Sequence, residues 1–230
     1  MFLASRLLVS FLWLACLVPA AHARQQQPQA PAPSSKSQEA APAEKKANAR
    51  PEAAAPAEPF DGATVEKMSA QCVTLDTEAG TIELEMLAEA APETARNFLN
   101  LAATGAYDTT VFSRVVRGFV VQGGDLSTRE KMTNEFARRS RRTVADEPNA
   151  VKHVRGVLSM ARSSEPNSAT THFFILVGDA PHLDGTFAAF GRVRSGMEVA
   201  DAINQTELEG ERPTKPVRIR RATVAPCPKM

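Results

Sequence analysis

Alternation of apolar and polar residues indicates that most of the chain after Val65 consists of short strands. Cys72–Asp76 and Thr81–Met86 alternate on either side of the turn-like stretch Thr77–Gly80, which predicts a hairpin. Further strands are predicted at 156–161, 173–177, 187–193 and 217–224. The chain is therefore expected to build a sheet whose strands are joined by turns.

Two stretches have helical rather than alternating spacing. In 91–105, Pro92 lies near the start, Glu93 is in the first turn, and Gly105 is placed to end the helix. Its apolar face is predicted to carry Ala95, Phe98, Leu99 and Ala102. A second helix is predicted at 197–204. Two helices among about eight strands, without regular strand-helix alternation, indicate a mainly β, antiparallel barrel with helices over its ends.

The stretch 111–125, VFSRVVRGFVVQGGD, has the densest chemistry. Two apolar runs flank Arg117-Gly118 and end at Gly123-Gly124, which predicts a strand, a tight turn and a second strand. Strand alternation places Phe112, Arg114 and Val116 on one side, and beyond the turn Phe119, Val121 and Gly123 on one side. Fixed donors beside apolar walls suit a concave binding site. The alternative is an ordinary strand with one solvated arginine.

The N-terminus has the form of a secretory signal. One positive charge in 1–6 precedes an apolar run at 7–20, and Ala21-His22-Ala23 provides a small-x-small cleavage site. We predict a signal peptide at 1–23, cleaved after Ala23, and therefore a periplasmic or secreted protein without stable membrane insertion. A retained anchor and a lipoprotein modified at Cys16 are the less favoured alternatives, because the apolar run is short and continues past the cysteine.

Residues 24–62 are rich in Pro, Ala, Gln, Glu and Lys, with almost no large apolar side chain. Such a segment buries too little surface to offset its ordering entropy, so a disordered linker is predicted. Its role is a spacer or, alternatively, a tether that binds a partner. The folded domain is predicted at 63–230.

Charge gives no reason to expect a nucleic-acid partner, because 27 Lys and Arg face 26 Asp and Glu in 230 residues. The polar stretch 126–153 contains four arginines at Arg138–Arg142. We interpret this run as a solvated loop, with an anionic partner as the alternative. The sequence suggests no Ser-His-Asp arrangement, metal-ligand spacing or phosphate loop, so neither a metal nor a cofactor is predicted.

The 111–125 stretch resembles the motif F-x-R-V-x-x-G-F-x-x-Q-G-G-D of the cyclophilin-type peptidyl-prolyl cis-trans isomerases. The matching residues are Phe112, Arg114, Val115, Gly118, Phe119, Gln122, Gly123, Gly124 and Asp125. Further matches are GVLSMAR at 156–162, HFFILV at 172–177 and HLDGTFAAFGRV at 182–193. The resemblance covers roughly 65–224 and implies an eight-stranded closed barrel.

This resemblance implies rotation about X-Pro peptide bonds, in a bacterial exported enzyme that assists folding. Its partners would be proline-containing unfolded or exported polypeptides, and the protein would be a monomer. The barrier to rotation is roughly 18–20 kcal/mol because the amide bond is conjugated. As the amide twists, the prolyl nitrogen gains a lone pair, and a fixed cationic donor would stabilise only that state.

By resemblance, the catalytic residues are Arg114, Phe119 and Gln122, with Arg114 as the donor. The implied substrate-binding residues are Val120, Ala161, Arg162, Phe174, His182, Leu183 and Phe187. The chain departs from the family's common pattern at Ser113, Arg117, Val120, His172, His182 and Phe187. These departures leave open an alternative function, a proline-peptide-binding or chaperone-like module with little turnover.

Two cysteines remain after the predicted cleavage, Cys72 and Cys227. The first and last strands are neighbours in the family's barrel, so the resemblance implies that the two could pair, and an oxidising compartment permits it. We predict a disulfide, with two inert core thiols as the alternative.

Overall fold

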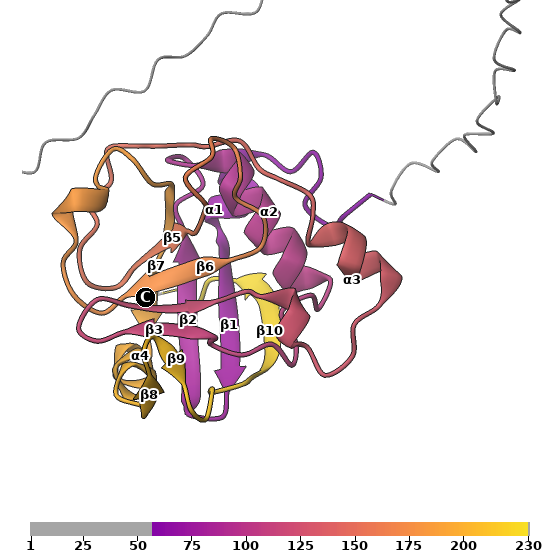
Figure 1. The fold of residues 1–230 in the computed structure, drawn as a ribbon. Helices are drawn as coiled ribbons and strands as arrows, with labels where there is room; N and C mark the ends of the chain where they lie inside the picture. Colours follow the sequence, from indigo (N-terminus) through magenta and orange to yellow (C-terminus); the bar gives the residue numbers. More distant parts are fainter. Residues whose placement is uncertain (1–56, 230) are drawn as a thin grey trace, which may run out of the picture. The chain divides into compact units, whose positions relative to one another are not determined.

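A computed structural model describes residues 57–229, and its centre is one curled antiparallel sheet (Figure 1). The eight strands are β1 (Gln71–Thr77), β2 (Gly80–Met86), β3 (Arg114–Val116), β4 (Val120–Gly123), β5 (Val157–Met160), β6 (Phe173–Leu176), β7 (Ala189–Ser195) and β10 (Ile219–Pro226). They pair in the order β10-β1-β2-β7-β5-β6-β4-β3. A separate hairpin consists of β8 (Leu208–Glu209) and β9 (Arg212–Pro213).

Closure of the predicted barrel is not confirmed. β10 and β3 are the two edges of the sheet and form no ladder with each other. The segment before β3 instead makes single backbone bonds: the Phe112 N–H donates to Val217 O at 2.9 Å, and the Ile219 N–H donates to Thr110 O at 2.8 Å. The sheet is thus curled, and irregular chain rather than paired strands bridges its edges.

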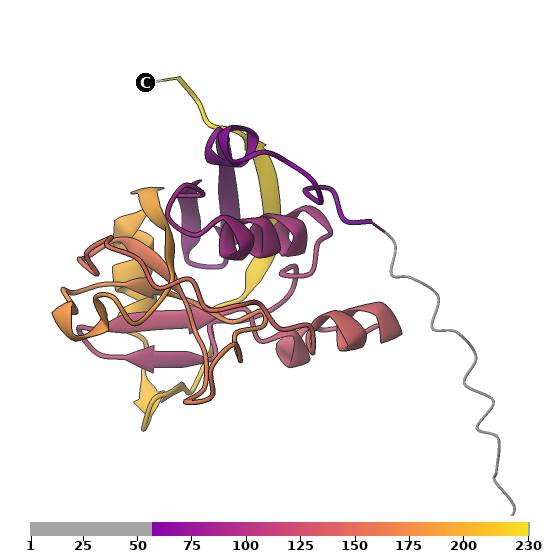
Figure 2. The ribbon, with the colours of Figure 1, turned by 90° about the horizontal axis from the view of Figure 1, so that it is seen from above.

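The predicted helices are present as α2 (Pro92–Ala103) and α4 (Met197–Asn204). α2 has no side-chain cap of its own, but the Glu147 carboxylate accepts hydrogen bonds from the N–H groups of Glu93 at 3.1 Å and Thr94 at 2.7 Å. A carboxylate at this end also complements the helix dipole. Figure 2 shows α2 lying across the sheet.

The main core lies between α2 and the inner face of the sheet. Phe98 of α2 is fully buried, and its ring centroid lies 5.1–5.2 Å from those of Tyr107, Phe173 and Phe190. Tilted and edge-on aromatic pairs of this kind stabilise a core beyond their buried area. The helix therefore fixes the strand that carries Phe173, which is β6.

Two helices, α1 (Val65–Ser69) and α3 (Asn134–Arg139), were not predicted. The interpretation of Arg138–Arg142 as a solvated loop is wrong for Arg139, which is 9% exposed. Its Nε donates to Glu58 Oε1 at 2.6 Å, and Thr133 caps α3 by accepting from the Phe136 N–H. The run of arginines does not by itself show that Arg139 is buried, because its partner Glu58 lies 81 residues earlier in the chain.

The packed chain starts before the boundary predicted at residue 63. Phe60 is buried in the main core, and its N–H donates to Asn100 Oδ1 at 2.7 Å. The predicted signal peptide at 1–23 and most of the linker at 24–62 lie outside the described residues. Within 57–229, no helix has the length and hydrophobicity needed to cross a membrane.

Cys72 and Cys227 form a disulfide, with their Cα atoms 4.8 Å apart and a sequence separation of 155. β1 pairs with β10, with Cys72 opposite Ala225, so the residue that follows β10 comes to lie beside the start of β1. The Cys227 N–H also donates to Ala70 O at 2.9 Å. The bond thus joins the two ends of the described domain.

Candidate active site

Strands β3, β4, β6 and β5 place alternate residues on opposite faces of the sheet. Arg114 is opposite Gln122, Gln122 is opposite Phe174, and Phe174 is opposite Ser159. Directly opposed residues in antiparallel strands point to the same face. The intervening residues Val115, Val121, Ile175 and Leu158 all belong to the main core. Arg114, Gln122 and Phe174 therefore share the outer face.

The predicted alternation is wrong at both ends of the hairpin. Phe112 was placed on the side of Arg114, but it is fully buried in the main core because β3 begins only at Arg114. Phe119 was placed with Val121, but it precedes β4 and packs with the outer cluster around Val120. Side chains alternate between the two faces of the sheet only within the paired strands.

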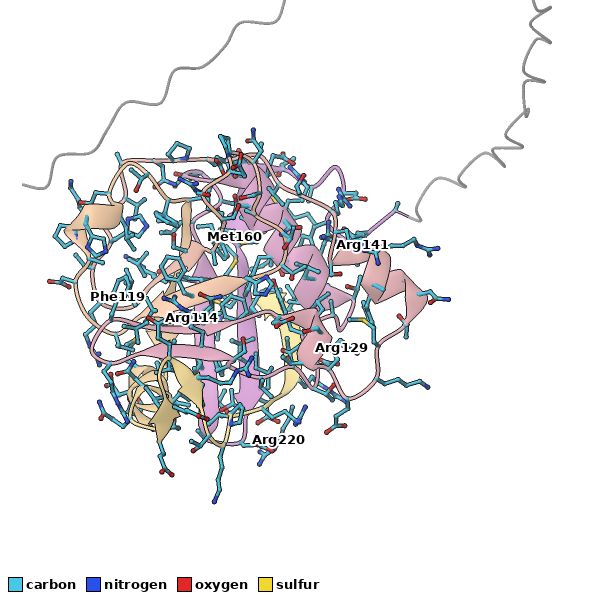
Figure 3. The ribbon with its side chains drawn as sticks, viewed as in Figure 1. Arg114, Phe119, Arg129, Arg141, Met160 and Arg220 are labelled. Atoms are coloured by element: carbon cyan, nitrogen blue, oxygen red, sulfur yellow. A yellow bond between two sulfur atoms is a disulfide. The ribbon has the colours of Figure 1, made fainter. Side chains whose placement is uncertain are left out.

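The outer face holds a cavity of about 160 Å³. Its lining consists of Arg114, Phe119, Val120, Gln122, Ala161, Arg162, Phe174, Leu183 and Phe187. Every one of these residues is in the predicted site, which the structure therefore gathers around one opening. Figure 3 shows Arg114 and Phe119 near each other on the same side of the molecule.

The apolar floor of the cavity is built on a second, smaller core. Val120 is 2% exposed, Phe174 6% and Leu183 8%. The Phe187 ring packs edge-on against Phe174 with centroids 6.0 Å apart, and the Arg162 guanidinium lies 5.0 Å from the Phe187 ring centroid. These contacts form fixed apolar walls of a size suited to a small ring. Phe187 lies before β7 (Ala189–Ser195), so the strand that was predicted to begin at residue 187 begins at residue 189.

Polar groups stand at one end of this floor. Arg114 Nη1 donates to Gln122 Oε1 at 3.3 Å, and Arg114 Nε donates to Glu211 Oε2 at 2.6 Å. The Arg114 side chain is 43% exposed, so it borders both the cavity and solvent. An arginine remains protonated at all working pH values. The cavity therefore carries a permanent cation beside an apolar surface.

His182 is the one predicted site residue outside the lining. It is exposed in the short 3₁₀ helix η2 (Pro181–Leu183), and its ring centroid lies 5.4 Å from that of Phe119. It can support Phe119 from the rim without bordering the cavity.

The turn between β3 and β4 is held from α4. Arg117 Nη1 donates to Asn204 O at 2.6 Å, and Nη2 donates to Thr206 O at 2.6 Å. The side chain of Asn204 makes a second contact with the turn, because its Oδ1 accepts from the Gly118 N–H at 2.9 Å. Gly118 has φ +67°, a left-handed conformation that glycine adopts without strain. Arg117, one of the departures from the family's common pattern, thus anchors the turn through α4 and the residues after it.

A Ser-His-Asp arrangement, which was not expected from the sequence, lies beside Phe174. His153 Nδ1 lies 3.3 Å from Asp184 Oδ1, and its Nε2 lies 3.1 Å from Ser159 Oγ. Ser159 Oγ also bonds to Ala188 O at 2.9 Å, and Ser159 is fully buried. Because no substrate can reach Ser159, its hydroxyl does not act as a nucleophile. The hydrogen bonds from Asp184 through His153 to Ser159 instead support the floor of the cavity. Burial lowers the pKa of His153, although Asp184 opposes that shift.

A second cavity of about 220 Å³ lies between α2 and the segment after α3. It is lined mainly by polar residues, including Arg96, Asn97 and Arg142. Arg96 already donates to Phe60 O and Ala63 O, and Arg142 to Glu58. This second cavity lacks the aromatic floor of the first one. Within the described chain, no group of three or more His, Cys, Asp or Glu side chains is placed to hold a metal ion.

Glu211 is a site residue that the sequence analysis did not find. It is 97 residues from Arg114 along the chain and lies in the turn of the β8–β9 hairpin. No local spacing connects the two, and only the folded sheet brings them together.

Comparisons with known proteins agree with this geometry. Residues 72–224 match the family model described as cyclophilin type peptidyl-prolyl cis-trans isomerase/CLD. Peptidyl-prolyl cis-trans isomerase CYP18-1 of Arabidopsis thaliana is 39% identical over 155 residues, covering 66% of this chain and 94% of the relative. Peptidyl-prolyl cis-trans isomerase A of Dickeya dadantii is 41% identical over 164 residues, covering 66% and 83%.

A solved structure extends the match to the fold. The Cryptosporidium parvum cyclophilin type isomerase, crystallised in the presence of the dipeptide Ala-Pro, superposes with a TM-score of 0.59 at 29% identity. The match covers 67% of this chain and 98% of that one. Together with the family model, it shows that the chain belongs to the cyclophilin-type peptidyl-prolyl cis-trans isomerases and is an isomerase enzyme.

Proposed function

We propose that this protein rotates X-Pro bonds of exported polypeptides in the outer-face cavity, with Arg114 stabilising the twisted amide. The observation that carries the proposal is the Arg114 guanidinium, bonded to Gln122 at the edge of an apolar floor. Proline-containing peptides as substrates are supported by the relative that was crystallised in the presence of Ala-Pro.

The apolar floor and the guanidinium have different tasks. Burying about three methylenes of a proline ring contributes roughly 2 kcal/mol, and it does so equally in the planar and twisted states. That contact therefore lowers KM without raising kcat. The guanidinium acts on the prolyl nitrogen only as its lone pair develops, so it raises kcat.

One charged hydrogen bond is insufficient for the whole effect. Such a bond contributes about 1.5–3 kcal/mol, whereas a millionfold enhancement requires roughly 8 kcal/mol. Desolvation of the amide over Phe174 and Leu183 favours the less polar twisted form. Gln122 and the backbone at Ala161 and Arg162 supply grips that keep the rest of the peptide from following the rotation.

The test is a protease-coupled isomerisation assay on an X-Pro peptide. Arg114→Ala is expected to lower kcat/KM about 10- to 100-fold, from the loss of one charged hydrogen bond. Arg220→Ala is the matched control: Arg220 is exposed on β10 and lies apart from Arg114 in Figure 3. Equal rates for the two variants would refute the role of Arg114.

The alternative function is a proline-peptide-binding or chaperone-like module with little turnover, which the departures from the family's pattern at Val120 and Phe187 would permit. Titration of an X-Pro peptide separates the two functions. A module with little turnover binds the peptide but raises its isomerisation rate only slightly, so Arg114→Ala then changes little in the assay. The presence of a cation at the end of the slot favours the enzyme, because binding a neutral ring does not need one.

Export to the periplasm or outside the cell is part of the proposal. It is supported by the signal-like sequence at 1–23 and is compatible with the Cys72–Cys227 disulfide, a bond typical of oxidising compartments. Fractionation of cells that express the full chain, with mass spectrometry of the mature N-terminus, tests it. A mature protein that begins at Met1 in the cytoplasm would refute it.

A further inference from the structure

The β8–β9 hairpin is docked on the edge of the sheet beside the site (Figure 1). Leu208 pairs with Pro213 and Glu209 with Arg212, so Gly210 and Glu211 form a two-residue turn. Gly210 has φ +63°, the left-handed conformation that such turns require. The Val115 N–H donates to Glu211 O at 2.8 Å, so the backbone of Glu211 is tied to the residue next to Arg114.

This backbone bond holds Glu211 beside β3, where Arg114 is within reach of its carboxylate. Its Oε2 accepts from Arg114 Nε at 2.6 Å, a short charge-assisted bond. The other side of the guanidinium is held by Gln122 through Nη1. No protein group within residues 57–229 accepts a bond from Arg114 Nη2. The guanidinium is therefore clamped at two of its nitrogens and has a donor to spare.

We propose that Glu211 is a positioning residue for the isomerase reaction. By occupying Nε, it turns the Nη edge of Arg114 toward Gln122 and the cavity, where the prolyl nitrogen would lie. The proposal rests on the function proposed above for Arg114. It assigns to the hairpin a part in catalysis that does not involve contact with the substrate.

Two effects of a carboxylate on this arginine oppose each other. Its charge weakens the field of the guanidinium, whereas its hydrogen bond fixes the orientation. The side chains are 43% and 56% exposed, so solvent screens the charge effect. A long arginine side chain has large rotational freedom, and its restriction in advance removes that cost from the transition state. The orienting effect therefore dominates.

The experiment measures kcat and KM for Glu211→Ala in the X-Pro peptide assay. We expect kcat to fall about fivefold, the upper value for an exposed ion pair, with KM unchanged. Glu211→Gln keeps an acceptor for Nε and is expected to recover part of the loss. The matched control is Glu209→Ala, which removes the same charge from the same hairpin at an exposed position and is expected to retain full activity.

A double-mutant cycle separates positioning from a merely structural role. In an Arg114→Ala background, Glu211→Ala is expected to have no further effect, because the group it orients is gone. An equal loss in both backgrounds would mean that the hairpin merely stabilises β3, and would overturn the proposal. If Glu211→Ala behaves like Glu209→Ala while Arg114→Ala is slow, the proposal is also overturned. If Arg114→Ala itself is unimpaired, the proposed role of Arg114 fails first.

A spectroscopic readout is independent of turnover. The Arg114 Nε–H signal in a ¹⁵N spectrum is expected to be shifted and protected from exchange in the parent, and to lose both properties in Glu211→Ala. If the signal stays shifted and protected from exchange in Glu211→Ala, Glu211 does not hold Nε.

Discussion

The half of the sheet formed by β3, β4, β6 and β5 has two faces made of alternate residues of the same strands. On the inner face, Val115, Val121 and Phe173 are fully buried in the main core. On the outer face, Arg114 is 43% exposed, and Phe174 borders a cavity. The two faces therefore differ by a single residue in register: one packs into the main core, and the other lines the cavity that we propose as the active site.

The difference shows why the site is rigid although it is open. Each side chain on the outer face is carried by a strand whose next residue is locked into the core. A register slip of one residue would exchange the two faces and lose both. Variants at adjacent positions of one strand test this difference between the two faces.

The largest effect is expected from Phe173→Ala on the inner face. Its ring lies 5.2 Å from that of Phe98 and 5.3 Å from that of Tyr107. Removing it leaves a cavity in the core, which typically costs about 3–5 kcal/mol of unfolding free energy. Urea unfolding followed by circular dichroism measures this loss. A loss below about 1 kcal/mol would show that the inner face is not the main core.

The next residue, Phe174, is expected to give the opposite profile. Phe174→Ala removes part of the proline slot, so KM should rise by about tenfold, with a smaller fall in kcat because part of the amide's desolvation is also lost. Its cost in stability should be smaller than that of Phe173→Ala, because one side of the ring already faces a cavity. Urea unfolding and the X-Pro assay on the same samples check both values. If kcat fell instead and KM stayed constant, the ring would not bind proline.

Gln122→Ala tests a second residue of the outer face, the one that bonds to Arg114. It removes the acceptor for Arg114 Nη1 and one grip on the peptide, so kcat/KM should fall about two- to tenfold, the value of one ordinary hydrogen bond. The midpoint of thermal unfolding should stay near that of the parent, since Gln122 is only half-buried. A large drop in that midpoint would place Gln122 among the structural residues.

The smallest effect is expected from His153→Gln, beneath the floor of the outer face. Burial lowers the pKa of His153 below its usual value near 6.5, despite the nearby Asp184. The unfolded chain then binds a proton more readily than the native one, so stability is full above about pH 6.5 and falls as the pH decreases below it.

Replacing His153 by Gln should flatten the dependence of the unfolding free energy on pH between about pH 7.5 and pH 5.5. Lys152 and Asp184 also carry charge near this ring, and the His182 ring lies nearby. The pKa of Asp184 is lowered, chiefly by the His153 backbone N–H, so its own contribution is lost only at more acidic pH. An unchanged slope in the variant would mean that His153 does not control it.

Much of the fold follows from local patterns. Pro92, the apolar face through Phe98, and Gly105 define α2 almost residue by residue, because a helix depends on neighbours within one or two turns. The hairpin β1–β2 is equally local. Phe112 shows the limit: its alternation with Arg114 is regular in sequence, but its N–H bonds to Val217, over a hundred residues away.

The lining of the cavity could be predicted because the family motifs carry it, and the residues that support it could not. Glu211, Asn204 and His153 act through partners that lie far away in sequence or whose burial is unknown in advance. Arg139 is the same case, since its run of neighbours suggests solvent while Glu58 draws it inward. In physical terms, periodicity specifies which face a residue occupies, but a long polar side chain finds its partner only after folding.

The disulfide turns residues 72–227 into a covalent ring that contains the whole eight-stranded sheet except Gln71. A mechanical load pulling on the two ends of the domain would travel through the sulfur atoms and bypass the strand ladders. A single nick in the exposed stretch around Lys131 and Met132 would likewise open the ring without releasing a fragment. While the disulfide is intact, neither a pull on its ends nor a single nick therefore divides this ring into separate covalent pieces.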